Sequence, residues 1–221
     1  RQGGGAARAQ ARGAGWAGKG ATWVKADMRS SGGALKGAVG EEHRRGRKVT
    51  GNLCSVTYGE AADLGIDNLE HGFFAATDFV ADKQPDVCPG QARGQQTIAA
   101  LDENGEPFKT LVKKLVDKHV ALTSTLTVFE TFTRGRPMPP GLDVLTPQLK
   151  ASFERAYERA QQNETSVYAT LFPKAMRMER AFVKAGGTLV ADTEPPGSGA
   201  VGPAAADQPQ PDLPVDAAAP P

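Results

Sequence analysis

Short apolar runs alternate with longer amphipathic segments along the middle of this chain. The pattern predicts strands at residues 21–26, 48–51, 66–70, 120–126 and 188–191, and helices at 34–45, 57–64, 108–119 and 149–185. We expect a break in the last helix near Pro173. Strands that alternate with helices pair in parallel through right-handed crossovers. The sequence therefore predicts an α/β fold with about five parallel strands and flanking helices.

Local signals support two of these helix ends. Thr57 and Glu60 have the spacing of a capping box, which predicts that Thr57 begins a helix. Gly46 follows the helix at 34–45 and can end it. Between the predicted elements, residues 82–106 and 134–147 are rich in turn-forming residues and are expected to be loops.

Composition separates the middle of the chain from its two ends. Residues 1–20 are rich in Gly, Ala and Arg and predict a flexible arm, and residues 197–221 predict a disordered Pro/Ala-rich tail. Residues 21–196 are then the folded domain. The whole chain of 221 residues has a formal net charge of +1, so no overall field favours nucleic acid or a membrane surface as a partner. No segment resembles a signal peptide, and we slightly favour the cytoplasm.

The chain has two cysteines, Cys54 and Cys88. Two cysteines are too few for a disulfide framework, and their spacing fits no zinc-ribbon pattern. Since an unpaired cysteine behaves mostly as a small apolar residue, we expect both to be buried free thiols.

Two polar residues stand directly after predicted strands. Asn52 follows the strand at 48–51, and His71 follows the strand at 66–70. In an α/β barrel, side chains at the carboxyl ends of parallel strands converge on one mouth. A histidine or asparagine at such a place can also be an ordinary turn residue, because Asn tolerates tight turn geometry.

Four segments resemble, in order, the metal-dependent amidohydrolase superfamily, in its imidazolonepropionase-like and Xaa-Pro dipeptidase-like branch. They are Trp-Val-Lys-Ala at 23–26, Gly-Ile-Asp-Asn-Leu-Glu-His-Gly at 65–72, Lys-Ala-Gly-Gly-Thr-Leu-Val at 184–190, and Leu-Val-Ala-Asp-Thr-Glu-Pro at 189–195. The resemblance covers residues 20–197 and only the C-terminal part of the family's barrel. It implies a partial (β/α)8 barrel, because a closed barrel needs eight strands and typically about 250 residues.

The resemblance also implies roles for single residues. Lys25 would be a lysine carboxylated by CO2 that bridges two metals. Asn52 and His71 would occupy two metal-ligand positions, with Asn52 where the family has histidine. Glu194 would be the catalytic carboxylate. The implied cofactor is a divalent metal, with zinc as the first choice because imidazole and carboxylate ligands suit it.

The implied reaction is hydrolysis of a C–N bond in an amide, cyclic amide or peptide, with a small molecule or short peptide as substrate. An amide oxygen at Asn52 is a poor zinc ligand, and the family's first-strand His-X-His pair has no counterpart here. Glu194 is longer than the usual Asp by roughly 1.5 Å, and displacements of about 1 Å can cost about a hundredfold in rate. We therefore expect impaired activity.

Two further expectations follow. The alternative function is an inactive barrel fragment that serves as a binding or oligomerisation module. An open barrel also exposes the edges of its outer strands, so we expect the chain to self-associate. Arg134 or Arg136, in the Pro-rich loop, could bind a substrate carboxylate, or they could simply be solvated surface residues.

Overall fold

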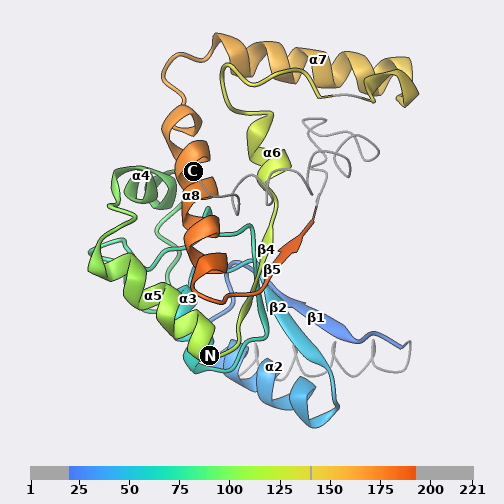
Figure 1. The fold of residues 1–221 in the computed structure, drawn as a ribbon. Coiled ribbons are helices and arrows are strands. Elements are labelled where there is room, and N and C mark those ends of the chain that lie inside the picture. The colour runs from blue at the N-terminus through green and yellow to red at the C-terminus, as the bar shows by residue number, and fades with distance from the viewer. Residues whose placement is uncertain (1–19, 140, 193–221) are drawn as a thin grey trace.

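The computed structural model describes residues 20–139 and 141–192 (Figure 1). Its centre is a five-stranded sheet in the order β1-β2-β3-β4-β5, and each strand is parallel to its neighbours. The strands are β1 (Trp23–Ala26), β2 (Lys48–Gly51), β3 (Asn68–Glu70), β4 (Ala121–Ser124) and β5 (Leu189–Ala191). The predicted α/β fold with five parallel strands and flanking helices is confirmed.

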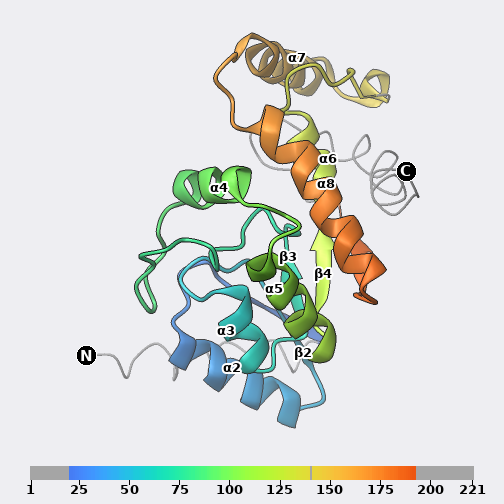
Figure 2. The ribbon, with the colours of Figure 1, turned by 60° about the vertical axis from the view of Figure 1, so that its left-hand side comes forward.

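Helices connect the strands and gather mainly on one face of the sheet. They are α2 (Gly32–Arg44), α3 (Tyr58–Asp63), α4 (Gln91–Ala100), α5 (Glu106–Asp117), α6 (Leu126–Glu130), α7 (Pro147–Gln162) and α8 (Tyr168–Lys184), with a 3-10 turn η1 (Leu142–Val144). Each of α2, α3, α5 and α8 contacts the next, so they form one layer, while α7 lies beyond α6 and the N-terminal end of α8 (Figures 1 and 2). Among the described residues, no helix is both long and apolar enough to cross a bilayer.

The main core lies between the sheet and this helix layer. Val49, Leu69 and Leu122, from the three central strands, are fully buried there. Leu115 of α5 and Phe182 of α8 belong to the same apolar cluster. Side chains alternate between the two faces of a strand, so this core uses every second strand residue.

The opposite face of the sheet carries polar side chains that bind one another. Asn68 donates through Nδ2 to the Thr50 and Thr123 hydroxyls, each at 2.8 Å. Thr50 donates to Glu70 Oε1 at 3.0 Å, and Lys25 forms an ion pair with Glu70. These residues lie on the same face because the register pairs them across β1 to β4.

Predictions that rest on interactions between neighbouring residues agree with the structure. The strand predicted at 48–51 is β2. Thr57 caps α3, and its capping box is complete, since Glu60 N–H donates to the Thr57 hydroxyl and Glu60 Oε2 accepts from Thr57 N–H at 2.8 Å. A capping box needs only four consecutive residues, which explains why the prediction is confirmed.

Three predicted segments differ from the structure. The loop expected at 82–106 contains α4, whose Ile98 is fully buried, and tertiary packing therefore overrides its weak helical pattern. The strand expected at 120–126 ends at Ser124, and α6 follows it. The loop expected at 134–147 contains the short turn η1.

The break predicted near Pro173 was wrong. Pro173 lies inside α8, and the chain leaves the helical path earlier, between the end of α7 at Gln162 and Tyr168. A proline inside a helix removes one backbone hydrogen bond. Its neighbours Leu171, Phe172 and Ala175 are buried in the core, and this burial stabilises the helix despite the lost bond.

The predicted domain limits are only partly within the described residues. The predicted arm, apart from Gly20, and the predicted tail at 197–221 lie outside them, as do residues 193–196 at the end of the predicted domain.

Candidate functional site

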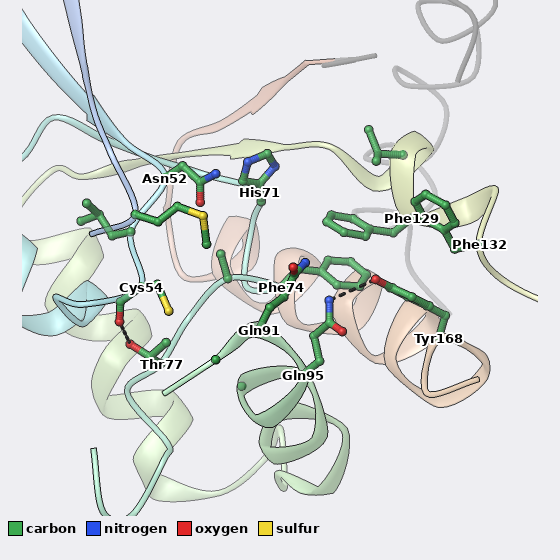
Figure 3. Close-up of a pocket in the computed structure, with 16 residues that line it drawn as sticks. Asn52, Cys54, His71, Phe74, Thr77, Gln91, Gln95, Phe129, Phe132 and Tyr168 are labelled. Atoms are coloured by element: carbon green, nitrogen blue, oxygen red, sulfur yellow. Dashed lines mark hydrogen bonds between the residues drawn. The ribbon is translucent and has the colours of Figure 1, made fainter. Parts of the chain in front are cut away.

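A pocket with a volume of about 620 Å³ lies at the carboxyl ends of the central strands (Figure 3). Asn52 follows β2 and His71 follows β3, and both side chains line this pocket. Since β2 and β3 are adjacent and parallel, their ends meet at the same edge of the sheet. The structure thus brings together two of the residues that the sequence had singled out.

His71 is held in a defined orientation at the pocket. Its backbone has φ 69°, in the left-handed region that a non-glycine residue seldom adopts. Its ring nitrogen Nδ1 lies 3.0 Å from the Thr125 hydroxyl oxygen, just beyond β4. Its ring also meets the edge of Phe129, with centroids 6.4 Å apart. Unusual backbone geometry of this kind is typical of turns and of functional sites.

Asn52 presents a neutral amide to the same pocket. Its backbone N–H donates to the carbonyl of Ala26 at 3.2 Å, which continues the pairing of β1 and β2 by one residue. This bond fixes the backbone, and the side chain lies beside His71 (Figure 3). The amide can donate and accept hydrogen bonds but carries no charge.

Lys25 does not line the pocket. It lies on β1, its side chain is 48% exposed, and it forms an ion pair with Glu70 on the polar face of the sheet. This pairing uses Lys25 as a cation, whereas a carboxylated lysine is an anion. Carboxylation of Lys25 therefore stays a prediction.

The described residues do not fit a complete metal centre. Within residues 20–139 and 141–192, no three His, Cys, Asp or Glu side chains lie close enough together to hold an ion. Among the described residues that line the pocket, His71 is the one imidazole, and Asn52 adds only a weak amide ligand. Glu194, the predicted catalytic carboxylate, lies outside the described residues.

Arg134 and Arg136 each have an acidic partner. Arg134 Nη1 lies 3.3 Å from Glu164 Oε1, and Arg136 Nε donates to Glu130 Oε1 at 2.6 Å. The Arg136 guanidinium also lies 5.4 Å from the ring centre of Phe172. Neither arginine is among the residues that line the pocket. Their proposed role in binding a substrate carboxylate stays a prediction.

Aromatic side chains form one wall of the pocket, and no pattern in the sequence had predicted this wall. Phe74 and Phe129 stack with centroids 3.7 Å apart. The Tyr168 ring centroid lies 6.1 Å from that of Phe129 and 5.7 Å from that of Phe132, at interplanar angles of 22° and 32°. The Tyr168 hydroxyl accepts a hydrogen bond from Gln95 of α4 at 3.1 Å. The position of Phe129 and Phe132 shortly after β4 was the available signal.

The expectation of two free thiols was wrong, because Cys54 and Cys88 form a disulfide. The disulfide joins Cys54, shortly after β2, to Cys88 in the segment before α4. Lys83 Nζ donates to the Ser55 carbonyl, and the Gly32 N–H donates to Asp86 Oδ1, each at 2.6 Å. These bonds hold the segment that leads into α4, and a spacing of 34 residues gave no hint of the pairing.

A buried carboxyl group contacts the residue that follows His71. Glu179 of α8 is fully buried against Gly72, the residue after His71. Burial raises the pKa of Glu179 to about 8, and the nearby Ser124 side chain lowers this pKa only in part. The sequence offered a weak signal for this group, since Glu179 shares a helix face with the apolar residues Ala175 and Phe182.

Known proteins are similar to this chain in fold and not in sequence. The sequence matches no protein-family model, and no curated protein matches it. A solved structure of a Xaa-Pro dipeptidase with bound methionine in its active site is similar, with a TM-score of 0.53 and 12% identity over 97% of this chain. A candidate prolidase from Bifidobacterium longum gives a TM-score of 0.54 and 16% identity over 99% of this chain.

The chain is shorter than these proteins. It spans 43% of the Xaa-Pro dipeptidase chain and 45% of the Bifidobacterium longum chain. Sequence identities this low support a similar fold but not a shared function, because function depends on the residues of a site. The chain therefore has an α/β fold similar to part of these two hydrolase-type structures.

Proposed function

We propose that this chain is part of an amidohydrolase-type barrel and that its pocket binds a small amide or short peptide. The chemistry that the resemblance implies is hydrolysis of a C–N bond by water with a divalent metal. The proposal rests mainly on one observation, that Asn52 and His71 follow adjacent parallel strands and line one pocket. The similar fold of a Xaa-Pro dipeptidase gives further support.

The residues of this pocket suit binding better than turnover. Asn52 can hydrogen-bond to an amide of a ligand both as donor and as acceptor. The described donors are too few for a metal centre. We therefore propose that hydrolysis by this chain is impaired, with Asn52 as the principal cause.

A second candidate function is that of an oligomerisation module. The outer strands of the described sheet are β1 and β5, and each presents a large apolar side chain, since Trp23 and Val190 are both 46% exposed. Open sheet edges with apolar side chains favour pairing with another chain.

The substitution Asn52→His tests the proposed origin of the impairment. It returns an imidazole beside His71, and imidazole binds zinc more strongly than an amide does. After dialysis from a buffer with zinc and bicarbonate, elemental analysis should find more zinc in this variant than in the native protein. The double variant Asn52→His/His71→Ala should lose the gain, and Xaa-Pro dipeptides and N-acyl amino acids should be hydrolysed faster by Asn52→His alone.

A matched control adds the same group away from the pocket. Asn104 lies on an exposed turn between α4 and α5, so Asn104→His adds an imidazole without changing the site. If Asn52→His binds no more zinc than Asn104→His, the proposal that Asn52 is the principal cause of the impairment is refuted. If the native protein nevertheless binds an amide in a separate measurement, binding without hydrolysis would be the function that remains supported.

A further inference from the structure

The described walls of the pocket contain no formally charged acidic or basic side chain. Of the described residues that line it, none is Asp, Glu, Lys or Arg. The nearby cations have partners elsewhere: Lys25 pairs with Glu70, and Lys83 donates to the Ser55 carbonyl. A charged ligand group that enters such a pocket loses its hydration without gaining a counter-ion, and this is costly.

Neutral hydrogen-bonding groups take the place of charges. Asn52, Gln91 and Gln95 bring three side-chain amides to the pocket, the last two from α4 (Figure 3). Within the described part of the chain, the side-chain amides of Asn52 and Gln91 have no hydrogen-bond partner. Because Gln95 donates to the Tyr168 oxygen, the Tyr168 O–H can still donate to a ligand. These groups match the paired donor and acceptor of an uncharged amide.

The aromatic side chains lie next to these amides, since Gln95 donates to Tyr168 of the aromatic wall. Figure 3 shows Phe129, Phe132 and Tyr168 on one side and Asn52 with His71 on another. Phe132 and Tyr168 are only half-buried, so their rings keep surface that a ligand can cover. Aromatic rings gain from stacking at centroid separations of about 4.5 to 7 Å. A ligand ring placed here would extend the existing stack.

From these observations we infer that the pocket selects uncharged amides that carry an aromatic ring, of the kind of an N-acylated phenylalanine amide. The amide would bind Asn52 and the amides of α4, and the ring would lie against Phe132 and Tyr168. This inference rests on the proposed function, because it names the ligand class of the same pocket.

Four related probes distinguish the effect of ligand charge on affinity from the effect of an aromatic ring. They are N-acetyl-phenylalanine amide, which is neutral; N-acetyl-phenylalanine, an anion; phenylalanine amide, a cation; and N-acetyl-alanine amide, neutral without a ring. Calorimetric titration of the full chain should give the first probe an affinity about tenfold or more above each of the others. Tight binding of the anionic probe would reveal a positive charge that binds its carboxylate. Tight binding of the cationic probe would show that aromatic faces alone recognise the ligand, through cation–π contacts.

Two variants test the contacts. Asn52→Asp keeps the shape and adds a carboxylate, so it should weaken binding of the neutral probe and strengthen binding of the cation. Phe132→Ala should reduce the difference in affinity between the phenylalanine and alanine amides, since Tyr168 remains. Leu149→Ala, at an exposed position on α7, is the matched control and should leave all affinities unchanged. Circular dichroism spectra that superimpose on the native spectrum establish that each variant is folded.

The outcomes distinguish the two proposals. If either charged probe binds as tightly as N-acetyl-phenylalanine amide, the inference about ligand class is overturned while the amide-binding function stands. If the alanine amide binds as tightly as the phenylalanine amide, the role of the aromatic wall is overturned. If none of the four probes binds, both the proposed function and this inference are refuted.

Discussion

The carboxyl group of Glu179 packs so closely against Gly72 that a Cβ atom at position 72 would overlap its Oε1. Gly72 also has φ 54°, which favours glycine, and its N–H donates to the Thr123 carbonyl at 2.8 Å. Tyr58 donates to the carbonyl oxygen of Gly72 at 2.8 Å. Helix α8 therefore contacts the segment just after β3, at the residue next to His71.

Gly72→Ala should strongly destabilise the fold. The added methyl group overlaps Glu179 and forces a left-handed backbone on alanine, at a combined cost of roughly 2 to 5 kcal/mol. Urea unfolding would measure the change. Gly46→Ala is the matched control, because Gly46 has φ 69° and open space at its Cβ, so it reports the backbone cost alone. Equal losses in the two variants would refute the close contact with Glu179.

Glu179→Gln should make stability less dependent on pH. Burial raises the pKa of Glu179 from 4.5 to about 8, so the folded chain keeps the proton that the unfolded chain releases above pH 4.5. The contribution of Glu179 is thus fully present below pH 4.5 and is lost as pH rises to 8, by about 1.4 kcal/mol per pH unit.

The variant has no such proton and should be more stable than the native chain at pH 7.5, by roughly 2 to 4 kcal/mol, with no gain at pH 4. Unfolding by urea at a series of pH values would measure both curves. Burial also raises the pKa of Tyr58, which lies near Glu179, but that group stays protonated over this range. Parallel curves for the two proteins would contradict a buried neutral carboxyl.

Loss of the disulfide should loosen α4 and the pocket. Cys54→Ser/Cys88→Ser opens a loop of 34 residues, and the chain-entropy estimate for such a loop is about 3 to 4 kcal/mol. Thermal unfolding would measure the loss, and hydrogen exchange should increase at Gln95 and Ile98. Val87→Ser, at an exposed neighbouring position, is the control. Unchanged exchange in α4 would show that the hydrogen bonds of Lys83 and Asp86 suffice to hold the segment.

Self-association through the sheet edges is the fourth prediction. The protein should sediment as species larger than a monomer, in proportions that depend on concentration, because apolar edge strands favour pairing. Trp23→Lys and Val190→Lys place charges on the two outer strands and should shift the distribution toward the monomer. Val144→Lys adds the same charge at an exposed position on η1 and should change little. A monomer at all concentrations would refute the prediction.

Local sequence determined much of the fold. The capping box of Thr57 and Glu60 and the strand at 48–51 depend on neighbouring residues, and both are present as predicted. The alternation of strands and helices determined the parallel sheet, because short connections leave few topologies. The positions of Asn52 and His71 after their strands also followed from the sequence, since parallel strand ends share one edge.

Contacts between distant residues decided the rest. The sequence placed a loop where α4 lies and a break where Pro173 continues α8, because burial of Ile98 and Phe172 outweighs weak local propensity. The pairing of Cys54 with Cys88, the stack of Phe129 on Phe74 and the contact of Glu179 with Gly72 each join segments far apart in the chain. Such contacts form only when the sheet and its helices pack, so local sequence determined the framework, while tertiary packing decided the walls of the pocket.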